Sequence, residues 1–277
     1  MKSLAQKLVA TTLFLLAPTG CSPSQREHAD TLEKIKREKR IEVCYVTMPP
    51  MVIKDSTTGK LKGHMIETLE EILSENHVYP RYHEQSWGTA ALALQSGICD
   101  LVATGYFIKT SRAFAVAFTE PLLYLGDSAL VRKQELRFQK ISEANDPAVT
   151  IAVALGESGH EYAKKFLPKA NLNVLEVEGG DLSRIYLEVQ NGRADMAISD
   201  SWNVKRFAEH HDNVEIKFQS PPLNLNAVAW AVRQNDVSLL NFIENALEVM
   251  KTSGRLIELE KKYKAHWLHK TTTFAQE

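Results

Sequence analysis

The chain has 277 residues, which is enough for one large domain or for two lobes of about 100 residues each. Hydrophobic residues make up 44% and charged residues 24% of the sequence, as in an ordinary globular protein. The formal net charge of -1 gives no electrostatic basis for binding nucleic acid or an anionic membrane surface. We therefore expect no nucleic-acid partner.

The N-terminus has the pattern of an export signal. Lys2 and Lys7 lie at the start, residues 8–17 form a short apolar core, and Pro18-Thr19-Gly20-Cys21 follows. This core is too short to cross a bilayer as an anchor. We expect removal of the signal and, after it, a flexible polar tether over residues 22–30.

Strands and helices then alternate. The predicted elements are a helix over 31–36, a strand over 41–46, a helix over 65–73, a strand over 81–83, a helix over 87–95, and strands over 100–104 and 118–122 that bracket a short helix with Arg112. Since crossovers between parallel strands need a helix, this order predicts a mainly parallel sheet flanked by helices.

A second alternation follows a strand predicted over 128–132. Its elements are strands over 149–153, 173–177 and 195–199, helices over 158–166, 182–190 and 202–209, a returning strand over 226–232, and closing helices over 237–251 and 256–263. We predict an α/β fold of two lobes, residues 31–125 with 226–265 and residues 126–225, followed by a tail over 266–277. Two connecting strands would let the lobes close by hinge motion.

Cys44 lies inside an apolar strand and Cys99 lies just ahead of another. A disulfide is allowed in an exported protein, but the separation of the two Cα atoms cannot be read from sequence. The interpretation we favour is two buried thiols.

Two opposite charges follow apolar strands. Arg112 comes after the strand that ends at Thr104, and Asp200 directly follows Ser199. Ligands of open α/β sheets bind at the carboxyl ends of strands. A guanidinium can hold a carboxylate through two hydrogen bonds, and a carboxylate attracts an ammonium group. The pair predicts binding of a small zwitterion without chemistry, although Asp200 could instead cap the helix after it.

No metal or cofactor site is predicted. The sequence His210-His211-Asp212 ends a helix in polar surroundings and lacks the paired spacing of zinc ligands.

Residues 30 to 265 resemble the periplasmic solute-binding proteins of amino-acid ABC transporters, bacterial extracellular solute-binding protein family 3. The matching segments, in order, are Arg40-Ile41-Glu42-Val43, Pro49-Pro50, Gly59-Lys60-Leu61-Lys62-Gly63, Trp87 with Ala93-Leu94-Gln95-Ser96-Gly97, Asp100-Leu101, Ser111-Arg112, Phe118-Thr119-Glu120-Pro121 and Gly192-Arg193-Ala194-Asp195. The resemblance implies the two-lobed periplasmic-binding-protein fold of type II.

It also implies roles for individual residues. Arg112 would bind the α-carboxylate of the ligand together with backbone N–H groups around Gly105 and Phe107, and Asp200 would bind the α-ammonium group. Phe107 stands where the family usually has Ser or Thr.

The walls of the site follow from the same resemblance. Trp87 and Met48 would enclose the ligand side chain, and Tyr45 lies where many relatives carry an acid. With Phe107, these residues favour a more apolar ligand than in proteins that bind basic amino acids.

The segment Gly156-Glu157-Ser158-Gly159 matches the family's second-lobe loop, which usually reads Gly-Thr-Thr or Gly-Thr-Ser. Ser158, with Glu161 three residues later, predicts a capping box at the start of a helix whose N–H groups attract an anion. The resemblance therefore counts Glu157 and Ser158 among the ligand-binding residues. Glu157 would repel a carboxylate. It points to solvent, or the ligand has an extra positive group, or the carboxylate binds elsewhere.

The predicted function is extracytoplasmic capture of an amino acid and its delivery to the membrane subunits of an ABC permease by a monomer. Small residues before Cys21 resemble a lipobox, so the resemblance places the protein in the periplasm with Cys21 lipidated and anchored to a membrane. Pro18 stands where the pattern usually has Leu, so a plain secretory cleavage without lipid stays open. Two alternatives stay open. One is an orphan sensory module similar to the non-catalytic part of membrane-bound lytic transglycosylases, and the other is an enzyme similar to cyclohexadienyl dehydratase.

Overall fold

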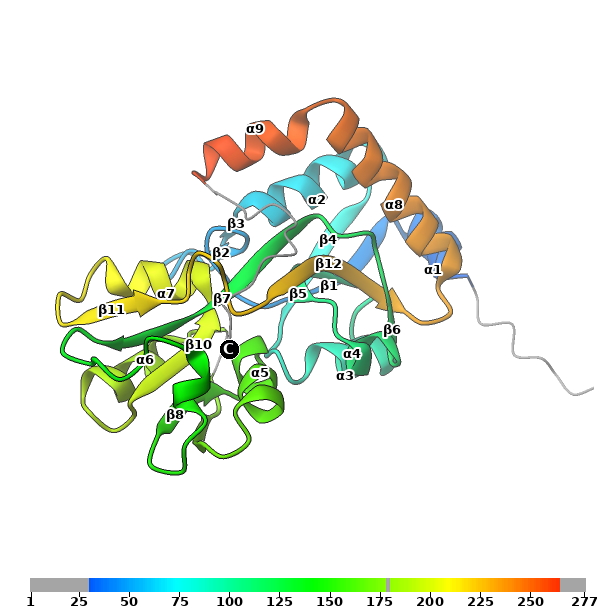
Figure 1. The fold of residues 1–277 in the computed structure, drawn as a ribbon. Coiled ribbons are helices and arrows are strands. Elements are labelled where there is room, and N and C mark those ends of the chain that lie inside the picture. Colours follow the sequence, from blue (N-terminus) through cyan, green and yellow to red (C-terminus); the bar gives the residue numbers. More distant parts are fainter. Residues whose placement is uncertain (1–29, 178–179, 265–277) are drawn as a thin grey trace, which may run out of the picture.

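The computed structural model describes residues 30–177 and 180–264. The predicted export signal, Cys21, nearly all of the tether and the predicted tail lie outside the described residues. The described part forms two α/β lobes connected by two long strands, as Figure 1 shows. The predicted fold class is therefore confirmed.

The first lobe contains the N-terminal elements and the last two helices. These are α1 (Thr31–Glu38), β1 (Arg40–Tyr45), β2 (Ile53–Lys54), β3 (Leu61–Lys62), α2 (His64–Glu75), β4 (Tyr79–Glu84), α3 (Ala90–Gln95), β5 (Leu101–Phe107), α4 (Thr110–Ala113), β6 (Val116–Phe118), α8 (Val237–Thr252) and α9 (Arg255–Lys262). Helices α2, α8 and α9 cover one face of its sheet, and α3 and α4 lie on the other (Figure 1).

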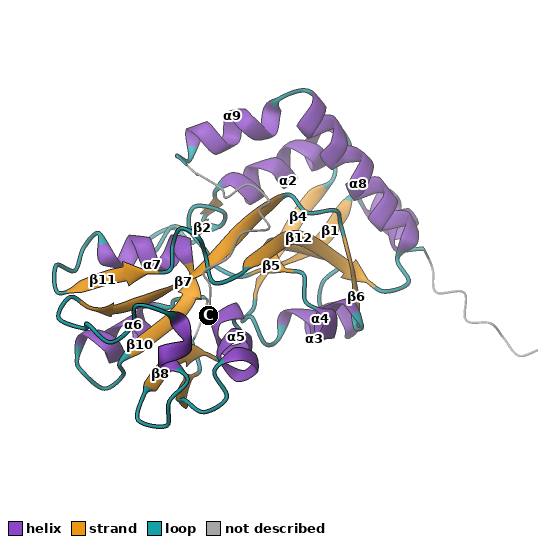
Figure 2. Cartoon of the chain, in the orientation of Figure 1, coloured by secondary structure: helices purple, strands orange, loops and turns teal. Residues whose placement is uncertain are grey.

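The second lobe contains the middle of the chain. Its elements are a 3-10 helix (Ile141–Ala144), β8 (Thr150–Ala154), α5 (Ser158–Phe166), β9 (Asn171–Leu175), α6 (Ser183–Gln190), β10 (Met196–Asp200), α7 (Ser201–Ala208) and β11 (Val214–Lys217). Figure 2 shows helices on both sides of its strands.

The connecting strands are β7 (Leu123–Arg132) and β12 (Leu225–Arg233). They pair with each other in antiparallel register over Leu123–Gly126 and Leu225–Val228. Strand β7 then continues along β10, and β12 continues along β5, so one ladder of strands, β4-β1-β5-β12-β7-β10-β8-β9, runs through both lobes. Each lobe has three parallel strands, but the connecting strands are antiparallel to their neighbours, so the sheet is mixed rather than mainly parallel.

Side-chain alternation along β10 explains how the second lobe is covered. Met196 and Ile198 belong to the buried cluster that also contains Tyr162 and Ala163 of α5, whereas Ala197 packs in the cluster of α6 and α7. This period of two is that of a strand buried on both faces. It leaves Asp200 at the carboxyl end of the strand, on the same side as Ile198.

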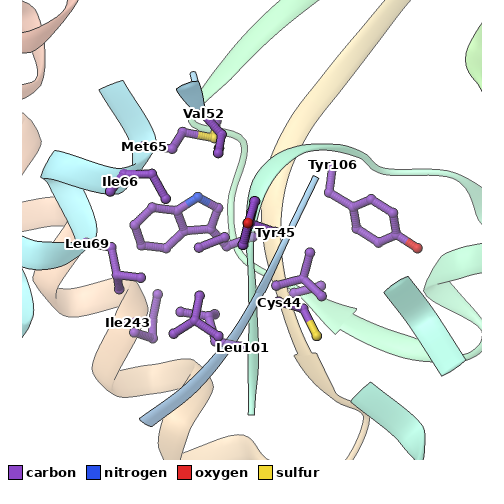
Figure 3. Packing of buried hydrophobic residues seen from close by; sticks show 14 of the residues in the cluster. Cys44, Tyr45, Val52, Met65, Ile66, Leu69, Leu101, Tyr106 and Ile243 are labelled. Atoms are coloured by element: carbon purple, nitrogen blue, oxygen red, sulfur yellow. The ribbon is translucent and has the colours of Figure 1, made fainter. Parts of the chain in front are cut away.

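The first lobe is organised around one large buried cluster. Figure 3 shows Met65, Ile66 and Leu69 of α2 with Ile243 of α8 on one side of the strands and Tyr106 of β5 on the other. Helix-spaced apolar residues on α2 therefore cover the sheet as the sequence predicts.

Cys44 and Cys99 form a disulfide, with their Cα atoms 5.6 Å apart. The expectation of two buried thiols is wrong. Parallel pairing of β1 with β5 places Cys44 opposite Val102, and Cys99 lies two residues before β5 begins. The strand pairing, together with the segment just before β5, where the Asp100 N–H donates to the Glu42 carbonyl, brings the two side chains within bonding distance.

The end of one predicted strand differs from the structure because a proline follows it. The strand predicted over 118–122 ends at Phe118, and β7 starts at Leu123, with Pro121 between them. Proline has no N–H group to donate to a ladder. The short strands β2, β3 and β11 were not predicted. No helix of the described residues is long and apolar enough to cross a membrane.

Candidate functional site

A small cavity lies between the lobes, where several strands end. It is lined by Met48, Trp87, Gly105, Phe107 and Arg112 of the first lobe and by Glu157, Leu182 and Asp200 of the second. It leaves about 10 Å³ for the centre of a water-sized molecule. That is room for about one water, so the lobes are closed and an amino acid could enter only after they separate.

Arg112 contacts both lobes. Its Nη1 donates to the carbonyl of Phe107 (3.1 Å), and its Nη2 donates to the carbonyls of Trp87 (3.4 Å) and Gly156 (2.9 Å). The guanidinium carbon lies 4.2 Å from the centre of the Tyr106 ring. These contacts hold the side chain at the cavity. Gly156 belongs to the second lobe, so the same guanidinium also connects the closed lobes.

Lys109 makes a second connection between the lobes. Its ammonium group forms an ion pair with Glu161 of α5 at 3.0 Å and lies 3.5 Å from the Gly156 carbonyl. Burial, and next the charge of Arg112, lower the pKa of Lys109. Two cations of the first lobe therefore face the start of α5.

Asp200 ends β10 and is 1% exposed. One carboxylate oxygen accepts from the backbone N–H of Asn203 (3.0 Å), and the other accepts from its side-chain amide (2.8 Å). Asp200 is thus the N-cap of α7 and also lines the cavity. Burial, followed by the charge of Glu157, raises its pKa to about 6.

Glu157 also lines the cavity and is 5% exposed, so the interpretation that it points to solvent is wrong. It is the N-cap of α5, with Oε2 accepting from the N–H of Gly159 at 2.8 Å. The predicted capping box of Ser158 and Glu161 is also wrong. Ser158 is already helical, and Glu161 reaches out to Lys109.

Gly159 allows this helix to start against the sheet. A Cβ atom at this position would lie 1.9 Å from the backbone oxygen of Ile198 in β10. No side chain fits there. The glycine therefore sets how closely Glu157 and Ser158 approach the end of β10.

The remaining cavity walls are apolar. Met48, Trp87 and Phe107 are 2%, 8% and 6% exposed. Gly105 lets the Met48 thioether lie against β5, because a Cβ atom on Gly105 would be 2.5 Å from the Met48 sulfur. The structure thus brings these four predicted residues together with Arg112, Asp200 and Glu157.

Tyr45 is not at the cavity. Its ring packs edge-to-face against Tyr82, with ring centres 6.1 Å apart, in the core of the first lobe. The prediction that Tyr45 lies beside the ligand is wrong, because it is not among the residues that line the cavity. Tyr45 is the last residue of β1, and its ring packs toward the neighbouring strand β4.

Asp127 was missed by sequence reasoning. It is fully buried on β7, directly opposite Asp200 in the ladder. Its Oδ1 lies 2.7 Å from Ser158 Oγ and accepts from Asn226 of β12 at 2.9 Å. Burial, and next the charge of Glu157, raise its pKa to about 8. A charged residue within the apolar run 122–131 could have indicated from the sequence that Asp127 is buried.

Comparisons with known proteins agree with this architecture. L-cystine-binding protein TcyA of Bacillus subtilis (strain 168) is 24% identical over 268 residues, which cover 95% of this chain and 97% of that protein. A probable histidine-binding protein of Neisseria gonorrhoeae is 24% identical over 208 residues, with coverage of 74% and 75%.

Among solved structures, the ancestral amino acid-binding protein AncCDT-1, a precursor of cyclohexadienyl dehydratase, matches with a TM-score of 0.75 and 29% identity. It covers 85% of this chain and 99% of that one. The model of the bacterial extracellular solute-binding proteins, family 3, matches residues 41–266. This chain therefore belongs to the bacterial extracellular solute-binding proteins of family 3.

Proposed function

We propose that this protein captures an amino acid or a similar small zwitterion between its two lobes and delivers it to an ABC permease. The observation that carries the proposal is the distribution of charge around the cavity. Arg112 comes from the first lobe, and Asp200 and Glu157 come from the second. A ligand with a carboxylate and an ammonium group would pair with both lobes and stabilise their closure.

The hydrogen bond from Arg112 to the Gly156 carbonyl supports a hinge mechanism. When the lobes open, this bond breaks and the guanidinium can donate to a ligand carboxylate instead. The ligand carboxylate would then replace the Gly156 carbonyl as the partner of Arg112. When the lobes close again, the ligand would connect Arg112 to the second lobe. The free energy of this exchange drives the conformational change.

The direct test is the identity of the bound molecule. Purified protein is denatured, and the released small molecules are analysed by mass spectrometry. Amino acids are then added to ligand-free protein while tryptophan fluorescence is recorded, because Trp87 lines the cavity. We expect a saturable signal with at least one amino acid. A flat response to all amino acids, with none released, would reject the proposal.

Replacing Asp200 by Asn separates its two roles. The amide oxygen still accepts from the Asn203 N–H, so the cap of α7 is retained, but the negative charge is lost. The contact with the Asn203 side-chain amide is lost, because the new NH2 group cannot accept from it. We expect a tenfold or greater loss of affinity, about 1.4 kcal/mol.

The pH dependence gives an internal check on Asp200. The wild-type carboxyl has its pKa raised to about 6, so affinity is expected to fall as pH drops through this value. Titration calorimetry should show that the Asp200→Asn variant lacks this step. A step of equal size in both proteins would assign the titration to another group.

Delivery and location complete the proposal. We propose that the protein acts as a monomer in the periplasm, held to a membrane by lipid on Cys21. The disulfide between Cys44 and Cys99 supports an oxidising compartment. Relatives named as amino-acid-binding proteins support transport rather than catalysis. Reconstitution with membrane permease subunits, followed by measurement of ligand-stimulated ATP hydrolysis, tests delivery.

A further inference from the structure

Three buried carboxyl groups lie together in the second lobe. Asp127, Glu157 and Asp200 are 0%, 5% and 1% exposed, respectively. Three ionised carboxylates without solvent would repel one another, and burial favours the neutral acid. Asp200 has two hydrogen-bond donors from Asn203. Asp127 and Glu157 instead share a hydrogen-bonding partner.

The hydroxyl of Ser158 connects Asp127 to Glu157. Its Oγ lies 2.7 Å from Asp127 Oδ1 and 2.7 Å from Glu157 Oε1. A hydroxyl has one proton and can donate to only one of two acceptors. The second short contact therefore requires a proton on one of the carboxyl groups, which donates to the serine oxygen. One of the two carboxyl groups in this bridge is therefore protonated, in addition to the proton of the serine hydroxyl.

The surroundings agree with one neutral acid. Within residues 30–177 and 180–264, Asp127 Oδ2 is fully buried and has no hydrogen-bond partner, which is costly for an ionised oxygen. Asn226 donates to Asp127 Oδ1 and Ser199 to Glu157 Oε1, and neither brings a charge. Tyr186 faces the group from α6, and burial raises its pKa, so it remains neutral.

The nearby cations belong to the other lobe. Lys109 and Arg112 interact electrostatically with Glu157, and both are partly engaged by the Gly156 carbonyl. Lys109 is also paired with Glu161. When the lobes open these cations move away, so within the second lobe the negative charge is balanced by protons or by ligand.

We propose that Asp127, Ser158 and Glu157 hold one shared proton at neutral pH, and that a cationic group on the ligand side chain displaces it on entering beside Glu157. The displacement rests on the proposed function, whereas the shared proton does not. Asp200 would pair with the α-ammonium group, and the positive charge on the side chain would take the place of the proton. One proton leaves to solvent for each ligand bound.

The titration of the bridge has a definite sign. Burial, with the charge of Glu157, raises the pKa of Asp127 to about 8, so the folded protein keeps a proton that the unfolded chain loses near 4. Stability is therefore expected to fall as pH rises toward about 8. A ligand cation lowers this pKa, so binding releases the proton and affinity rises over the same range.

Infrared spectroscopy of ligand-free protein tests the shared proton. A protonated carboxyl gives a carbonyl stretch that an ionised one lacks. We expect this band at about pH 7 and its loss at about pH 9. The variants Asp127→Asn and Glu157→Gln should both lack it, while the matched control Asp195→Asn keeps it. Asp195 belongs to the same lobe, directly precedes β10 and is ion-paired with Arg137.

An absent wild-type band, or a band kept in both variants, would overturn the shared proton. If a variant does not fold, the wild-type protein still decides by thermal melting. Its stability should drop between about pH 6 and about pH 9, and a flat profile would refute the bridge.

Calorimetry with L-arginine, L-lysine and L-citrulline tests the displacement. Titrations at about pH 7 in phosphate and in Tris buffer give the number of protons released. L-arginine or L-lysine should release close to one proton, and L-citrulline, which is neutral at the side chain, markedly fewer. Equal release by L-arginine and L-citrulline, or no binding of either cationic amino acid, would overturn displacement. The infrared result stands in either case.

Discussion

Replacing Arg112 by Ala is expected to weaken ligand binding by at least about 2 kcal/mol, roughly 30-fold. The variant removes the guanidinium that three backbone carbonyls and the Tyr106 ring hold at the cavity. Titration calorimetry with the amino acid found by mass spectrometry gives the number. Arg112→Lys should recover part of the loss, since an ammonium group keeps the charge but not the planar pair of donors.

A matched control shows whether the effect is local. Arg255→Ala removes an arginine of the same lobe that pairs with Glu71 and Glu258 of α2 and α9, away from the cavity. Its affinity should equal that of the wild type. If folded Arg112→Ala also binds as tightly as the wild type, the carboxylate role of Arg112 is ruled out.

Removing the disulfide is expected to have the largest effect on stability. The bond joins residues 55 positions apart, and closing a loop of that length restricts the unfolded chain by about 4 kcal/mol. The double variant Cys44→Ala/Cys99→Ala should lose roughly that free energy of unfolding in urea denaturation. Ligand affinity should stay unchanged, because neither residue lines the cavity.

Thiol counting provides the control for this prediction. Unfolded wild-type protein, kept free of reductant, should show no reactive thiol at Cys44 or Cys99, and reduction should expose two. Two reactive thiols before reduction would show that the pair is not oxidised, and equal stability of variant and wild type would contradict the predicted contribution.

The arginine variant and the disulfide variant are expected to affect different equilibria. Arg112 and Asp200 act on the equilibrium between open and closed lobes, which a ligand shifts by binding the closed form more tightly. Cys44 and Cys99 act on the equilibrium between the folded and unfolded chain, inside one lobe. Variants of the first kind should change mainly affinity, and variants of the second kind should change mainly stability.

Much of the fold could be predicted from local pattern. Helix-spaced apolar residues on α2 and the apolar strands β5, β8 and β10 give the order of elements, because periodicity is a property of neighbours in sequence. The same order placed Arg112 and Asp200 after strand ends. The sequence pattern was too weak to predict where Pro121 ends a strand. It was also too weak to predict short strands such as β11 at a sheet edge.

What the sequence alone determined is the two-lobed α/β architecture and a set of residues that could share a cavity. Only the tertiary structure decided that Glu157 is buried, that Tyr45 packs into the core, that Cys44 meets Cys99 and that Asp127 lies opposite Asp200. Each of these depends on strand register and on contacts between residues far apart in the chain. Local periodicity does not encode them, because a one-residue shift in pairing reverses the direction of every side chain.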